Sequence, residues 1–176
     1  MRANLEPIEG FSLAEISPIK EGVANHTVTL VPPNYVNTVW PDVEGLLRGG
    51  ADRTGGRWDI RSLFFALANG EQQLWVTFDK DNEITNALTT EIIHYPNKTA
   101  LAIQFAGGVD GQTGGSTIDV VLNRLERYAK DVGCHCIEIW GRKGFSRKLK
   151  KSGYEESMIF YEKDITPVGR GGVLPR

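Results

Sequence analysis

The run from Gly108 to Thr117, GVDGQTGGST, has the features of a site for a phosphate group. It follows an apolar, strand-like segment at residues 99–106 and leads into an amphipathic helix. Glycines such as Gly111, Gly114 and Gly115 adopt positive φ readily and let the backbone approach a ligand. The helix start adds unbonded N–H groups and the positive end of its dipole. The run therefore predicts a phosphate or pyrophosphate site, with a plain flexible turn as the alternative.

The run differs from the two common nucleotide-binding motifs. A Walker loop ends in Gly-Lys followed by Ser or Thr, and no lysine follows these glycines. A Rossmann fingerprint opens a βαβ unit early in its domain, whereas this run lies late in the chain. The sequence therefore indicates phosphate binding of another kind.

The two cysteines, Cys134 and Cys136, lie two residues apart in a predicted strand. That spacing places their Cα atoms near the far limit for a disulfide, so we expect reduced thiols in a cytosolic protein. The cluster with His135 also lacks a second group of Cys and His residues, so we expect no metal site.

The length and composition of the chain limit the classes of protein to which it can belong. A chain of 176 residues suits one domain, and 20 Lys and Arg against 22 Asp and Glu leave a net charge of −2. This balance does not favour nucleic-acid binding. No apolar run approaches the roughly 18 residues needed to span a bilayer, and the first residues lack the apolar stretch of a secretory signal. We therefore expect a soluble protein of the cytoplasm with no membrane contact.

The chain divides into a core domain at residues 27–165, an N-terminal extension at 1–26 and a C-terminal tail at 166–176. Prolines and glycines in both end segments disfavour regular structure. The extension also carries apolar residues such as Phe11 and Ile16. We therefore expect it to dock on the core, on a second copy of the chain or on another protein.

Hydrophobic periodicity predicts the elements of the core domain. We expect strands at residues 26–31, 72–79, 83–96, 99–106, 134–140 and 154–165, and helices at about 38–48, 59–67, 117–132 and 144–152. Asn37 or Thr38 caps the first helix, and Gly49 and Gly50 end it. The third helix is the most regular, with an apolar face at Ile118, Val121, Leu122, Leu125, Ala129 and Val132. The order β-α-α-β-β-β-α-β-α-β predicts an α/β fold with a mixed sheet and helices on both faces.

This order, with a glycine turn after the fourth strand, resembles the Gcn5-related N-acetyltransferase (GNAT) superfamily and its acyl-CoA N-acyltransferase fold. The superfamily's pyrophosphate motif is Arg/Gln-x-x-Gly-x-Gly/Ala, and QTGGST at 112–117 matches it except at Thr117. The Gly153-Tyr154 pair after the last helix is similar to the superfamily's ending. The resemblance covers roughly residues 27–165.

Three further stretches resemble acetyltransferase-like proteins of tailed phages and prophages. They are VWPDVEGLL (39–47), ANGEQQLWVTFD (68–79) and GRKGF (141–145). Some proteins of that group act in the virion or in its assembly. This likeness implies phage structural proteins as partners, in the host cytoplasm or in the virion.

The GNAT resemblance implies that acetyl-CoA binds where the fourth and fifth strands splay apart. Its pantetheine amides would pair with the open edge of residues 101 to 106, among them Leu101, Ile103 and Phe105. Its pyrophosphate would bind the N–H groups from Gly114 to Thr117. Gln112, Gly114, Gly115, Ser116 and Thr117 are the motif positions implied.

The resemblance also implies direct acyl transfer to an amine. A base removes a proton from the amine, and a tyrosine on the last helix protonates the departing thiolate. The position that matches this tyrosine, four residues before Gly153, is Leu149, which has no proton to donate. The role is therefore vacant or is filled by Tyr154, Tyr161 or Ser146.

The carboxylates on core strands, Glu91 and Glu138, are the candidates for the base. A glutamate on a strand more often faces solvent or accepts a structural hydrogen bond. His94 stands at a strand end, where histidines are usually solvated. The basic residues of the last helix could bind the 3′-phosphate of CoA or an acidic partner, or simply form its wet face: Arg142, Lys143, Arg147, Lys148, Lys150 and Lys151.

Two functions follow from these residues. The first is an N-acetyltransferase that uses acetyl-CoA on an amine. The second is a non-catalytic phage virion or head-assembly protein that keeps the fold, because fold alone does not decide function.

Overall fold

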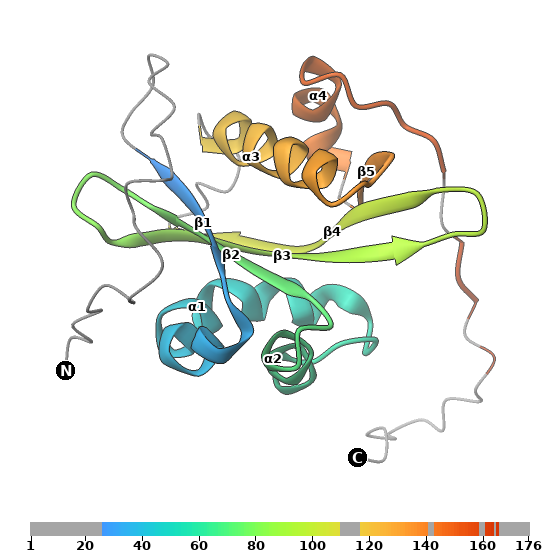
Figure 1. The fold of residues 1–176 in the computed structure, drawn as a ribbon. Helices are drawn as coiled ribbons and strands as arrows, with labels where there is room; N and C mark the ends of the chain where they lie inside the picture. The colour runs from blue at the N-terminus through green and yellow to red at the C-terminus, as the bar shows by residue number, and fades with distance from the viewer. Residues whose placement is uncertain (1–25, 110–116, 141–142, 159–160, 164, 166–176) are drawn as a thin grey trace.

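The computed structural model describes residues 26–109, 117–140, 143–158, 161–163 and 165, without the side chains of Lys143 and Phe145 (Figure 1). Its centre is a five-stranded sheet in the order β1-β2-β3-β4-β5. The strands are β1 (Thr27–Val31), β2 (Gln73–Phe78), β3 (Ile84–His94), β4 (Thr99–Gly108) and β5 (Cys136–Ile139). Neighbours from β1 to β4 pair antiparallel, whereas β4 and β5 pair parallel. The predicted mixed sheet is thus confirmed.

Helices cover both faces of this sheet. The helices are α1 (Val36–Ala51), α2 (Ile60–Ala68), α3 (Thr117–Asp131) and α4 (Lys143–Lys151), with 3-10 turns η1 (Pro33–Tyr35) and η2 (Asp52–Thr54). In Figure 1, α1 and α2 lie below the sheet, and α3 and α4 lie above it. Each face buries its own apolar cluster. Leu47, Leu63 and Phe105 belong to the α1–α2 side, and Trp75, Leu101 and Leu125 to the α3 side.

The hairpin between β2 and β3 is set by its turn. The carboxylate of Asp79 accepts hydrogen bonds from the backbone N–H groups of Asp81 (2.9 Å) and Glu83 (3.0 Å). Asn82 takes the left-handed conformation at φ 60°, which asparagine tolerates better than most residues. This local geometry places β3 in register for the antiparallel pairing with β2.

Two adjacent threonines on β3 provide a matched test of core hydrogen bonding. Both are fully buried. The hydroxyl of Thr90 accepts from the Trp75 indole N–H (2.9 Å) and donates to Gln73 Oε1 (2.9 Å), whereas that of Thr89 has no partner. Thr90→Val should lower the free energy of unfolding by about 1–3 kcal/mol, because it leaves the indole N–H buried and unbonded. Thr89→Val should leave it unchanged or raise it. Urea denaturation of both variants measures the difference, and equal losses would contradict the assignment.

The first helix ends later than the sequence predicts. It continues through Gly49 and Gly50 to Ala51 and tightens into η2, and the left-handed Gly55 (φ 65°) follows. Ala51 is fully buried and extends the apolar face of α1, which keeps the chain helical. A Cβ on Gly50 would stand at an ordinary packing distance of 3.5 Å from Phe105 Cβ, so α1 packs on β4 here without requiring a glycine.

The structure corrects two other expectations, both in the C-terminal half of the chain. Val132 is 41% exposed, because α3 ends at Asp131 and Gly133 turns the chain away at φ 76°. The strand expected at residues 154–165 is not formed at 154–158, 161–163 or 165. Glu156 instead bonds to Ser146 and Lys150 on α4, which holds that part of the segment against the helix and away from a sheet edge.

Candidate active site

A β-bulge opens the sheet on one side of β4. In the pairing with β3, Thr89 faces Phe105 and Thr90 faces Ile103, so Gln104 is an extra residue in β4. Bulges bend a strand and increase its twist. The parallel pairing with β5 ends at the same place, since Ile103 is its last paired residue and faces Ile139.

Beyond this bulge β4 continues to Gly108 with no strand on the β5 side among the described residues. The expectation of an open edge at residues 101–106 is therefore correct only from Gln104 onward. A cleft of about 1280 Å³ lies at this divergence. Its walls come from the end of α1, η2 and the loop after it, β3, β4, the first turns of α3, the end of β5 and α4.

A close contact between backbones forms part of the cleft wall. A Cβ built on Gly107 would stand 1.7 Å from the carbonyl oxygen of Leu46 on α1. Only glycine therefore allows α1 to lie this close to the end of β4. Trp58 packs edge-on against Phe105 with ring centroids 5.8 Å apart, which joins the loop after η2 to the same strand.

The cleft contains a buried polar atom without a partner. Asn86 lines the cleft and is 5% exposed, and its Oδ1 accepts no hydrogen bond in the structure. Buried oxygens of this kind are normally satisfied, and Oδ1 could accept from an N–H or O–H donor of a ligand once the side chain turns to expose it to the cleft. This acceptor and the unpaired β4 edge fit a long ligand that carries amide groups, as acetyl-CoA does.

The predicted cofactor residues fall into three groups. Ile103, Phe105 and Thr117 line the cleft, and Thr117 at the start of α3 is 6% exposed. Leu101 is fully buried beneath α3 and paired with Ile137, away from the cleft. Gln112, Gly114, Gly115 and Ser116 lie outside the described residues, so their part in phosphate binding stays a prediction.

The two candidate bases occupy different environments. Glu138 lies outside the cleft lining, with its side chain 17% exposed, and accepts bonds from Tyr95 Oη (2.8 Å) and Lys98 Nζ (3.2 Å). These contacts join the turn between β3 and β4 to β5. They also raise the pKa of Tyr95 and of Lys98, because the neighbouring carboxylate favours the protonated form of each.

Glu91 also lies outside the cleft lining, but one side chain links it to the cleft. Its Oε2 accepts a hydrogen bond from Gln104 Nε2 at 3.0 Å, and Gln104, the bulge residue, lines the cleft. The bulge thus brings an amide from the cleft wall onto this carboxylate. Of the two glutamates, Glu91 has the closer connection to the site.

These placements predict different outcomes for two conservative substitutions. Glu138→Gln should leave acetyl transfer nearly unchanged and lower the free energy of unfolding by about 1 kcal/mol, because it weakens a structural hydrogen bond to Tyr95. Glu91→Gln should lower kcat, by about 10²-fold if this carboxylate removes the proton. Steady-state rates and urea denaturation separate the two effects. A greater loss of kcat in Glu138→Gln would reverse the assignment.

The position that the GNAT resemblance implies for the general acid holds an apolar side chain. Leu149 on α4 lines the cleft. The hydroxyl of Tyr154 lies outside the cleft lining and is buried, and this burial together with the Glu126 carboxylate raises the pKa of Tyr154 well above its usual range. Ser146 donates to Glu156 (2.7 Å), and Tyr161 is 85% exposed. None of these three described side chains lines the cleft beside Leu149.

The structure adds cleft residues that the sequence did not single out as ligand contacts. Arg53 and Arg57 flank the glycine turn after α1, and Trp140 stands at the end of β5, 61% exposed. Of the basic residues expected on the last helix, Lys148 lines the cleft. The RTGGRW run at 53–58 carries no motif that would have singled these residues out from the sequence.

Comparison with solved structures identifies the fold. An aminoglycoside acetyltransferase from an uncultured soil metagenomic sample, in complex with sisomicin, matches with a TM-score of 0.60 and 11% identity, over 80% of this chain and 97% of that one. A predicted acetyltransferase from Clostridium acetobutylicum with acetyl-CoA matches with a TM-score of 0.55 and 16% identity, over 80% and 96%. The fold is that of the GNAT acetyltransferases.

A third GNAT-fold structure extends the comparison to a plant enzyme. The glucosamine-6-phosphate N-acetyltransferase from Arabidopsis thaliana matches with a TM-score of 0.57 and 12% identity, over 81% of this chain and 99% of that one. No protein-family model and no curated protein matches the sequence. The likeness is therefore one of fold. The sequence identities are too low to assign a substrate to this chain.

Two further properties concern the described part of the chain. No helix there is long and apolar enough to cross a bilayer. That part also contains no group of three or more His, Cys, Asp or Glu side chains placed to hold a metal ion.

Proposed function

We propose that the protein binds acetyl-CoA in the cleft between β4 and β5 and transfers the acetyl group to an amine. The observation that carries this proposal is the β4 edge left unpaired beyond the Gln104 bulge, beside a large cleft that ends at the start of α3. An unpaired strand edge offers backbone N–H and C=O groups to the amides of an extended ligand. The acetyltransferase fold supports the same reading.

The residues of this chain would divide the binding task along the cleft. The backbone from Gln104 to Gly108 would pair with the pantetheine arm. The side-chain oxygen of Asn86 would accept a hydrogen bond from an N–H or O–H group of the ligand. Thr117 and the motif glycines before it would bind the pyrophosphate through backbone N–H groups. Bound acetyl-CoA supplies the activated acyl thioester.

Of the candidate residues, Glu91 alone would take part in proton transfer. The amine must lose a proton to attack, and Glu91, linked to the cleft by Gln104, is the proposed acceptor of that proton. Leu149 offers none to the departing thiolate. At neutral pH the thiolate can take its proton from water, which predicts slow turnover compared with an enzyme that has a tyrosine there.

Titration calorimetry with acetyl-CoA tests the binding half of the proposal. Gly115→Asp should abolish the binding heat, because it puts a carboxylate and a Cβ where the backbone must approach the pyrophosphate, at a cost of about 3–5 kcal/mol for an unpaired like charge. Asn123→Asp is the control, since it adds the same charge on the exposed side of α3, outside the cleft lining. Unchanged affinity in Gly115→Asp would remove the loop from the site.

The apolar side chain of Leu149 favours a second candidate, a protein that keeps the fold without catalysis. Absence of any heat with wild-type protein at millimolar acetyl-CoA would favour this candidate over the first. A place in a phage virion or in head assembly, and self-association through residues 1–26, remain sequence-based hypotheses within it.

A further inference from the structure

We propose that the acceptor amine carries an anionic group, a carboxylate or a phosphate, which Arg53 and Arg57 bind on the α1–α2 side of the cleft. The inference rests on the proposed function, since it names the class of acceptor for that site. Four observations carry it: the charges that line the cleft, the way the arginine loop is held, the carboxylate already bound by Arg57, and the unsatisfied oxygen of Asn86.

The charge of the cleft wall has one sign. Among the described residues that line it, the charged ones are Arg53, Arg57 and Lys148, and no Asp or Glu is present. Lys148 belongs to α4, above the sheet, whereas both arginines belong to the layer below it (Figure 1). The cofactor phosphates are proposed to bind at α3, also above the sheet, so the two arginines are left to face the acceptor.

The loop that carries the arginines is held by its own hydrogen bonds. Thr54 Oγ1 donates to the Ala51 carbonyl (2.8 Å) and accepts from the Trp58 N–H (2.9 Å). Arg57 donates through one guanidinium nitrogen to the Thr54 carbonyl at 2.7 Å. Trp58 in turn packs on Phe105, next to the unpaired part of β4. The Arg57 guanidinium is therefore positioned relative to the open edge of β4.

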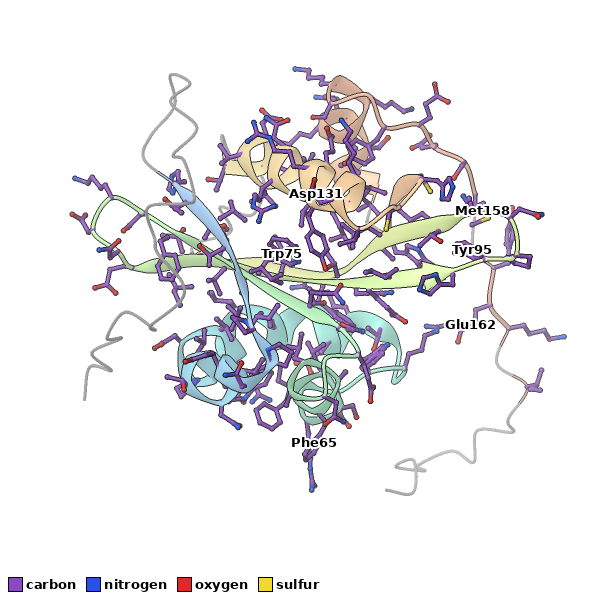
Figure 2. All side chains as sticks on the ribbon, viewed as in Figure 1. Phe65, Trp75, Tyr95, Asp131, Met158 and Glu162 are labelled. Atoms are coloured by element: carbon purple, nitrogen blue, oxygen red, sulfur yellow. The ribbon has the colours of Figure 1, made fainter. Side chains whose placement is uncertain are left out.

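Arg57 already binds a carboxylate of this chain. Its second terminal nitrogen forms an ion pair with Glu162, and both side chains are about half exposed. Figure 2 shows Glu162 on the segment that follows α4, directed towards the α1–α2 layer. Half-exposed pairs are weak and exchange readily. The contact shows that this guanidinium can bind a carboxylate, and a bound acceptor would replace Glu162 as its partner.

The unsatisfied oxygen of Asn86 supplies the complementary half of the recognition. It is an acceptor without a donor among the described residues, on a residue of the same cleft wall, and a turn of the side chain would expose it to the acceptor. An amine brings N–H donors, and an anion brings acceptors for guanidinium groups. An acceptor with both groups fits this set of side chains better than a polycation, which would meet two arginines and no described carboxylate in the lining.

Matched pairs of small amines test the proposal. The probes are glucosamine 6-phosphate against glucosamine, for phosphate, and β-alanine against β-alaninamide, for carboxylate, with kanamycin as a polycation. Binding is followed by NMR through the Trp58 indole N–H signal, assigned with Trp58→Phe, without and with acetyl-CoA. At least one anionic probe should bind about tenfold more tightly than its neutral or cationic partner, because hydrogen bonds between charged groups are the stronger ones. The pair that shows the preference identifies the anionic group of the acceptor as a carboxylate or a phosphate.

Two variants connect the preference to the arginines. The double variant Arg53→Gln and Arg57→Gln should remove the preference for the anionic member. Arg61→Gln should keep it, since Arg61 lies exposed on α2, outside the cleft lining. Equal binding of both members of each pair, tighter binding of kanamycin, or a preference that survives the double variant would overturn the inference.

The outcome also separates this inference from the proposed function. If acetyl-CoA binds but the paired amines bind alike, the proposed function stands and the anionic acceptor is wrong. If the arginine-dependent preference is found while acetyl-CoA gives no heat, the anion site is supported and the acetyl transfer is not.

Discussion

Leu149→Tyr is expected to raise the rate of acetyl transfer by about 10²-fold. Leu149 lines the cleft from α4, so a tyrosine there would place a hydroxyl within it. An absent general acid typically lowers the rate by about 10² to 10⁴, and the variant should recover the lower part of that range without optimised geometry. Release of free CoA, followed with a thiol reagent at saturating acetyl-CoA and amine, measures the change.

Leu149→Phe is the matched control, because it adds the same ring without the hydroxyl. Its rate should stay at the wild-type level. Tyr154→Phe should also have no effect on turnover, since the Tyr154 hydroxyl is buried beside Glu126, outside the cleft lining. A fast wild-type enzyme that Tyr154→Phe inactivates would show that Tyr154 holds the acid role. Equal gains in the Tyr and Phe variants would show that the ring, and not the proton, mattered.

Gly107→Ala is expected to lower the free energy of unfolding by about 3 kcal/mol or more. The added methyl would lie 1.7 Å from the Leu46 carbonyl oxygen, so α1 must move away from β4. Overpacking costs about 1–3 kcal/mol when side chains can adjust, and here the obstacle is backbone on both sides. Urea denaturation measures the loss, and weaker acetyl-CoA binding should accompany it because the same contact forms the cleft wall.

Gly144→Ala serves as the control for this substitution. Gly144 lies in α4, where an added methyl would have no neighbour within 4 Å, and alanine favours a helix by about 0.5–1 kcal/mol over glycine. The control should therefore be neutral or slightly more stable. If Gly107→Ala unfolds at the same urea concentration as wild type, the close approach of α1 and β4 is not a constraint on the fold.

Local sequence patterns were sufficient for most elements of this fold. The apolar spacing in α3 and the turn residues at Asp79 and Asn82 act over a few positions, so they predict a helix and a hairpin without knowledge of the tertiary structure. Gly49 and Gly50 did not end α1 as expected, because the buried Ala51 continues the apolar face of the helix against the sheet. The strand expected at 154–165 does not form at 154–158, 161–163 or 165, where Glu156 bonds to Ser146 and Lys150 on α4 instead.

The site depended more strongly on long-range structure. The GNAT resemblance implied Ile103, Phe105 and Thr117 as cofactor contacts, and all three line the cleft. Nothing local distinguished Glu91 from Glu138, because both are glutamates on core strands. The bulge at Gln104 and the contacts with Tyr95 and Lys98 separate them.

The sequence by itself therefore predicted the mixed sheet and most of its elements, which follow from residue type and short-range periodicity, and the GNAT resemblance placed Leu149 at the position of the general acid. Only the tertiary structure decided where β4 loses its partner, and which charges meet there. Arg53 and Arg57 are about fifty residues from the strand they lie beside, and Glu162 is 105 residues from Arg57. Such contacts arise from the packing of α1 on β4 and leave no periodic trace in the chain.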